Sequence, residues 1–178
     1  MTKVGVGTTI LDWVHIKTDI PEGGRNFVRT ATLDECTSLA AALGILGCSR
    51  LDVRYEVKPL SGGRYRCHGK MTAAMTQACV VTIEPVAATL DEALDVSFWP
   101  AAEIPAETDS EREILSEPDI EPLVDGRIEI GRVVYELVAA SIDPYPRKDG
   151  ADFVWSDDKP EDKEPSPFAV LSKLKDKL

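Results

Sequence analysis

The stretch that decides the fold is Arg64-Tyr65-Arg66-Cys67-His68-Gly69-Lys70-Met71-Thr72-Ala73. Its side chains alternate with period two, and successive side chains of a β-strand point to opposite faces of the sheet. One set is basic and comprises Arg64, Arg66, His68 and Lys70; the other is apolar and comprises Tyr65, Cys67, Met71 and Ala73. The pattern therefore predicts a strand with one basic, solvated face and one apolar, buried face.

A second alternating stretch, residues 51–58, comes just before the first. Its apolar positions are Leu51, Val53, Tyr55 and Val57, and charged residues stand between them. The intervening residues 59–63 contain one proline and two glycines, which is typical of a turn. We therefore expect the two strands to form a long antiparallel hairpin.

Elements on either side of the hairpin complete an α+β fold. Thr32 and Glu35 have capping-box spacing, and apolar residues follow at helical intervals, which predicts a helix over 33–46 that ends at Gly44 or Gly47. A second helix is predicted over 131–142 from its broad apolar side. Alternation predicts a third long strand over 90–98, with a slip near Asp91 and Glu92, and shorter strands within 8–18 and over 27–30 and 126–130. The prediction is an antiparallel sheet of roughly five or six strands with two flanking helices.

Two segments depart from this globular pattern. Residues 101–125 carry nine acidic side chains against Arg112 alone and are interrupted by prolines, so they are predicted to be an acidic, solvated loop. One domain is expected over 1–155, followed at 156–178 by a charged linker and a short amphipathic tail helix. A helix of this length is only marginally stable in isolation, so we expect it to dock either on its own domain or on a partner. Its candidate partner-binding residues are Phe168, Leu171 and Leu174.

Charge limits the classes of partner. The chain has 178 residues and a formal net charge of −11, whereas nucleic-acid-binding domains are usually basic. Binding of RNA or of an anionic membrane over the whole surface is therefore disfavoured. Residues 48–70 nevertheless hold six Lys or Arg against two acids, which gives +4 there and −15 elsewhere. This segregation favours a basic protein partner or a local basic patch on an acidic body.

The predicted outer face of the hairpin is the candidate RNA-binding surface. Arg64 and Arg66 would contact phosphate oxygens of the RNA backbone, and His68 and Tyr65 would flank these contacts. The alternative is an ordinary solvated face that balances the acidic body. The candidate RNA-binding residues are Arg54, Arg64, Arg66, His68 and Lys70.

Neither catalysis nor metal binding is predicted. The chain has no Gly-rich phosphate loop, GxSxG or HExxH motif, and no motif joins His15 or His68 to a cysteine. We therefore expect no enzymatic activity, cofactor or small-molecule substrate. Cys67 and His68 are adjacent on a strand and point to opposite faces, so we do not expect them to bind one metal together. The four cysteines form no CxxC pair, and no signal-peptide core or membrane span is evident, so buried thiols in the cytoplasm are expected.

Four further stretches carry a family resemblance. They are Gln77-Ala78-Cys79-Val80-Val81-Thr82-Ile83-Glu84-Pro85-Val86, then Asp125-Gly126-Arg127-Ile128-Glu129-Ile130-Gly131 with the later Asp143-Pro144-Tyr145-Pro146-Arg147-Lys148, and finally Pro167-Phe168-Ala169-Val170-Leu171-Ser172-Lys173-Leu174-Lys175. In this order they resemble the YceD family in its alpha-proteobacterial type. These are bacterial and plastid proteins linked to accumulation of large-subunit ribosomal RNA.

The resemblance implies a role in ribosome biogenesis and brings no catalytic mechanism with it. The leading expectation is a non-enzymatic factor that supports synthesis, processing or accumulation of large-subunit (23S) rRNA, with rRNA or a basic ribosomal protein as partner. The alternative is a protein-interaction adaptor that uses the acidic loop and the tail helix. Many members of the family carry Cys-x-x-Cys where this chain has Cys79-Val80-Val81-Thr82, so only Cys79 matches a metal-ligand position.

Overall fold

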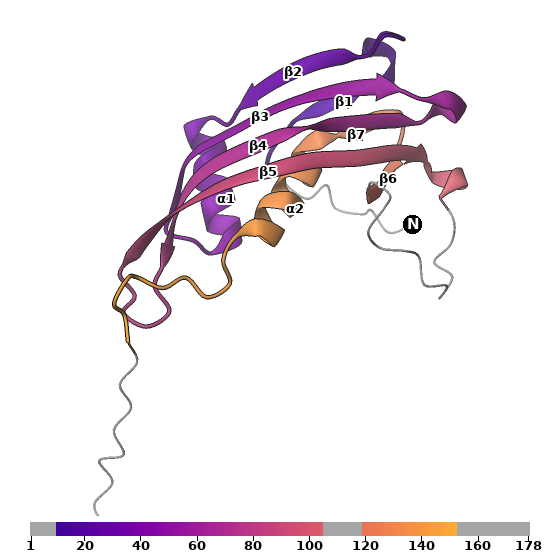
Figure 1. Ribbon diagram of the computed structural model, residues 1–178. Coiled ribbons are helices and arrows are strands. Elements are labelled where there is room, and N and C mark those ends of the chain that lie inside the picture. The colour runs from indigo at the N-terminus through magenta and orange to yellow at the C-terminus, as the bar shows by residue number, and fades with distance from the viewer. Residues whose placement is uncertain (1–9, 105–118, 153–178) are drawn as a thin grey trace, which may run out of the picture.

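A five-stranded sheet with the order β2-β3-β4-β5-β6 forms the body of the molecule (Figure 1). The computed structural model describes residues 10–104 and 119–152. The strands are β2 (Arg25–Thr30), β3 (Gly47–Pro59), β4 (Tyr65–Ala78), β5 (Pro85–Pro100) and β6 (Asp119–Leu123). The first four strands are antiparallel, and β6 lies parallel to β5. The predicted α+β fold with a mainly antiparallel sheet is confirmed.

The predicted hairpin is the pair of β3 and β4. Val57 lies opposite Cys67 and Val53 opposite Met71, and all four side chains are completely buried. Gly69 stands in the same buried row, and a Cβ atom there would lie 2.1 Å from the carbonyl oxygen of Arg54. The two strands therefore approach so closely at this point that only glycine fits.

Two helices cover one face of the sheet. These are α1 (Leu33–Leu43) and α2 (Ile130–Ser141), and both lie beneath the arched strands on the concave side (Figure 1). A two-stranded sheet joins β1 (Val14–Ile16) to β7 (Arg127–Glu129), and single 3-10 turns occur at Lys17–Asp19, Ser61–Gly63 and Ala101–Glu103. The core between the layers includes Leu39, Leu51, Met71, Val96, Phe98, Val134 and Val138. Within the described ranges no helix covers the convex face, so the outer side chains of β3, β4 and β5 are left to solvent.

The capping signals place α1 as predicted. The Thr32 hydroxyl accepts a hydrogen bond from the Glu35 amide at 3.2 Å, and the Glu35 carboxylate accepts one from the Thr32 amide at 2.8 Å. These bonds satisfy two amide groups that a helix start leaves without partners. Gly44 then adopts a left-handed conformation with φ +66° and ends the helix, so Gly44 rather than Gly47 is the terminator.

The prediction of one acidic loop over 101–125 is wrong at its C-terminal end. Residues 119–123 form β6, which pairs with β5 from Val96 to Pro100. Acidic side chains and Pro122 are tolerated there because β6 is an edge strand and its outer backbone groups need no ladder partner. Ile120 and Leu123 are half-buried. Residues 105–118 of the predicted loop lie outside the described residues.

The third long strand is longer and more regular than predicted. It is β5, and it keeps continuous register with β4 from Pro85 to Phe98, so the expected slip at Asp91 and Glu92 is wrong. Glu92 lies opposite Met71 on the inward face and is half-exposed. A carboxylate is accommodated there because residues 85–95 of β5 have, in the described part of the chain, a strand neighbour on one side only.

The predicted linker and tail helix at 156–178 lie outside the described residues. None of the helices that are described is long and apolar enough to cross a membrane.

Candidate nucleic-acid interface

The predicted RNA-binding residues occupy two places on the sheet. Arg54, Arg66, His68 and Lys70 lie on the outer face of the hairpin, where Arg54 stands directly opposite Lys70. Arg64 precedes β4 at the end of the sheet. Four of the five side chains thus share one surface, which we call the outer face.

Carboxylates from the neighbouring strands pair with most of these cations. Arg66 makes two hydrogen bonds to Asp95, at 2.9 and 2.7 Å, and these bonds raise the pKa of Arg66 and lower the pKa of Asp95. Lys70 lies 2.7 Å from Asp91, and the His68 ring lies 3.3 Å from Glu56. Every one of these three acids belongs to the same outer face.

The outer face therefore carries little net charge. Its cations are Arg50, Arg54, Lys58, Arg66 and Lys70, and its carboxylates are Asp52, Glu56, Asp91 and Asp95, which sum to 5 − 4 = +1. Most of the positive charge counted along the hairpin is offset in space, because β5 contributes two acids.

In these ion pairs, another anion can replace the carboxylate at small cost in free energy. The side chains of Arg66 and Asp95 are 46% and 42% exposed, and those of Lys70 and Asp91 are both 62% exposed. Pairs in such solvated positions contribute about 0–1 kcal/mol. Within the described residues no carboxylate lies within 4 Å of the Arg54 guanidinium. A phosphate group could therefore replace the internal acids at small cost.

A shallow hollow of about 440 Å³ opens on the outer face near the hairpin turn. Its lining comprises Lys58, Leu60, Arg66, His68 and Asp95. Lys58 stands directly opposite Arg66, and Leu60 supplies an exposed apolar surface. The hollow combines cations that can bind phosphate with the imidazole ring of His68 and the aliphatic side chain of Leu60. Groups of these kinds bind the backbone and the bases of single-stranded RNA. Leu60 is absent from the predicted site, and Lys58 is counted among the basic residues of the hairpin but not among the candidate RNA-binding residues.

Arg64 and Tyr65 differ from their expected roles. Arg64 pairs with Glu103 at 2.9 Å, and its guanidinium carbon lies 3.7 Å from the centroid of the Trp99 ring, in cation–π geometry. The Tyr65 hydroxyl donates a hydrogen bond to the carbonyl oxygen of Lys17 at 3.4 Å, on the inward side. The expectation that Tyr65 flanks the RNA-binding surface is therefore wrong, because odd-numbered positions of β4 face inward.

The turn between β4 and β5 is organised around the sulfur of Cys79. Its Sγ accepts hydrogen bonds from the backbone amides of Val81, Thr82 and Lys148, each at 3.4 Å. Hydrogen bonds from the Thr82 side chain and then from the Lys148 and Thr82 amides lower the pKa of Cys79 to about 6. The sulfur thus ties this turn to the segment after α2, and the Lys148–Glu84 ion pair at 2.9 Å adds a second link.

The donor set at this turn does not fit a metal ion. Thr82 occupies the position where the family resemblance implies a second cysteine, and the nearby Lys148 offers an amide N–H and an ammonium group, which are not metal ligands. Across residues 10–104 and 119–152, no group of three or more His, Cys, Asp or Glu residues is placed to hold a metal. Cys67 and His68 face opposite sides of β4, as predicted, since Cys67 is buried and His68 is exposed.

The other histidine is a core residue. His15 stacks on Phe27 with ring centroids 3.9 Å apart, and its Nε2 atom lies 2.7 Å from the Tyr55 hydroxyl. Burial, followed by the nearby charges of Arg29 and Arg25, lowers the pKa of His15 to about 4. His15 is therefore neutral near pH 7 and forms part of an aromatic stack under β2 and β3.

Comparison with known proteins gives one match. The family model described as "Large ribosomal RNA subunit accumulation protein YceD" matches residues 67–175, which are 109 of the 178 residues. No curated protein and no solved structure was found to match the chain.

Proposed function

Because this chain belongs to the YceD family of large ribosomal RNA subunit accumulation proteins, we propose that it is a non-enzymatic cytoplasmic factor that contacts large-subunit rRNA through its outer face. The observation that carries the proposal is the hollow lined by Lys58, Arg66 and His68. A small local site of this kind reconciles RNA contact with a net charge of −11, because it needs only a few phosphates.

The arrangement of like charges supports this assignment. Lys58 lies directly opposite Arg66, and Arg54 lies directly opposite Lys70. Like charges facing each other across two strands are destabilising. Two such pairs, with the Glu56–His68 pair between them, cost stability without filling the core, which is the pattern expected where cations serve a ligand.

The test is a gel-shift titration of a large-subunit rRNA transcript at several salt concentrations. The double variant R66E/K70E should lose at least tenfold in affinity, because two phosphate contacts become repulsions. The logarithm of the wild-type affinity should fall with that of the salt concentration with a slope of about −0.7 for each phosphate contacted on single strands.

The matched control is R127E/R147E, which makes the same charge change at two exposed arginines away from the outer face. It should bind RNA as the wild type does, apart from a small long-range effect. Equal losses of RNA affinity in both double variants would contradict a local site. Unchanged affinity in R66E/K70E would contradict the proposal that the outer face contacts RNA.

A second candidate is an adaptor that binds a basic ribosomal protein. The small net charge of the outer face, +1, and the net charge of −11 of the whole chain favour it. It would use the acidic residues 105–118 and the tail residues Phe168, Leu171 and Leu174, all of which lie outside the described residues. Binding to purified large-subunit proteins that is lost on deletion of 166–178 and retained in R66E/K70E would favour this candidate over the first.

A further inference from the structure

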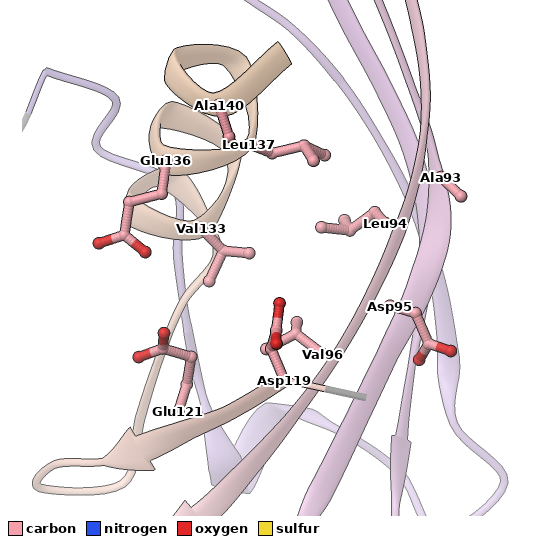
Figure 2. Close-up of a pocket in the computed structure, with 10 residues that line it drawn as sticks. All are labelled: Ala93, Leu94, Asp95, Val96, Asp119, Glu121, Val133, Glu136, Leu137 and Ala140. Carbon is pink, nitrogen blue, oxygen red and sulfur yellow. The ribbon is translucent and has the colours of Figure 1, made fainter. Parts of the chain in front are cut away.

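An apolar groove lies on the side of the sheet opposite the outer face, between β5 and α2. Its volume is about 260 Å³, below the roughly 300–1,000 Å³ of typical small-molecule sites. Figure 2 shows Val133 and Leu137 of α2 facing Leu94 and Val96 of β5 across the opening. The groove thus has the size and the lining to hold a few apolar side chains.

Acidic side chains stand at the mouth of this groove. They are Asp119 and Glu121 of β6 and Glu136 of α2 (Figure 2). Arg132 pairs with both Glu121 and Glu136, so the four side chains sum to −3 + 1 = −2. Val133 and Leu137 remain only half-buried. An apolar floor with a negative rim fits a segment that carries apolar side chains on one side and lysines beside them.

The C-terminal residues of the same chain have this chemistry. Residues 166–178 place Phe168, Leu171, Leu174 and Leu178 at helical spacing, the pattern of an amphipathic helix that fills a groove. Lys173, Lys175 and Lys177 against Asp176 give +3 − 1 = +2, which matches the rim.

We propose that residues 166–178 dock in cis into the groove between β5 and α2. Thirteen residues, 153–165, separate this segment from the last described residue, Asp152, and they can span about 45 Å when extended. A short tether holds its end at millimolar effective concentration, so even weak contacts populate the docked state. This proposal is independent of the outer face, because the groove opens on the other side of the sheet.

Zero-length carbodiimide crosslinking of the full chain, read by peptide mass spectrometry, tests the proposal. Lys173, Lys175 or Lys177 should become joined to Asp119, Glu121 or Glu136. A charge at the centre of the apolar side, Leu171→Asp, should reduce these crosslinks about tenfold. The lysines would also react with acids at 157–164, and those local crosslinks provide an internal standard that L171D should leave unchanged.

Two matched controls separate docking from general damage. Ala169→Asp adds the same charge on the opposite side of the segment and should keep the groove crosslinks. On α2, Leu137→Lys should abolish them, whereas Ala139→Lys, at an exposed position of the same helix, should not. Circular dichroism of each variant verifies that the fold is intact.

Mixing isotope-labelled and unlabelled chains identifies the source of each crosslink. Crosslinks within one chain support the proposal. Mixed-label crosslinks would overturn it in favour of a second copy, and an absence of groove crosslinks beside normal local ones would overturn it in favour of a separate partner.

Discussion

At the scale of single residues, Cys79 has the most unusual chemistry in the described chain. Three backbone amides donate hydrogen bonds to its sulfur, and the Thr82 side chain together with these amides lowers the pKa of its thiol to about 6. Burial raises the pKa of Cys36 to about 11 and that of Cys67 to about 12. The turn therefore favours a thiolate near neutral pH, and its amides stabilise that charge as they would any anion.

We predict that the native chain shows a thiolate titration with a midpoint near pH 6. The folded pKa lies below the unfolded one, so the stability that Cys79 contributes is complete above the unfolded pKa and is lost as the pH falls through 6. Thiolate absorbance measured against pH tests this, with Cys79→Ser as the variant that should lack the transition. A midpoint above pH 8 would mean that the amides do not stabilise the sulfur as a thiolate.

At the scale of elements, the hairpin depends on one close contact. A Cβ atom on Gly69 would lie 2.1 Å from the Arg54 carbonyl oxygen and 2.6 Å from the Tyr55 Cα atom, so β3 and β4 would have to separate. We expect Gly69→Ala to lower the free energy of unfolding by about 2–3 kcal/mol, as overpacking does. Urea denaturation measures the change.

The control is Gly47→Ala in the same strand pair. A Cβ atom at Gly47 meets nothing within 4 Å and its φ is ordinary, so this change should be neutral or slightly stabilising. Equal losses in both variants would show that the glycine content of the strands, rather than the close approach at Gly69, limits stability.

The sequence allows some elements to be predicted because their signals are local. Alternation along 51–58 and 64–73 predicts the hairpin, and the pair Thr32 and Glu35 predicts the start of α1, since each signal involves neighbours in the chain. β6 could not be predicted in this way. Its acids and Pro122 indicate a loop, and its strand conformation depends on the edge of β5, which is about 20 residues away.

The same limit applies to the candidate site. The basic positions of β4 are visible as an alternating pattern, but Asp95 is 29 residues from Arg66 along the chain. Only the register between β4 and β5 brings that carboxylate onto the outer face. Local patterns therefore predict which cations share a surface, whereas the neutralising acids and the hollow beside Leu60 require the folded sheet.

At the scale of the whole molecule, the two faces of the sheet have different charge. The outer face carries five cations against four carboxylates, while the mouth of the groove on the other side is negative. The long-range field of an acidic protein repels RNA, so contact must depend on close-range replacement of carboxylates by phosphates. The carboxylates of the outer face thus act as internal competitors for its cations.

This competition leads to a prediction that a simple count of positive charge does not make. The double variant D91N/D95N frees Lys70 and Arg66 from their partners and should raise RNA affinity about tenfold. The salt slope should steepen by about 0.7 for each cation released, because more counterions leave the RNA on binding. The control D34N/D149N makes the same change in net charge, −11 + 2 = −9, at exposed acids outside this face. If both double variants bind equally well, the overall field rather than local competition governs binding.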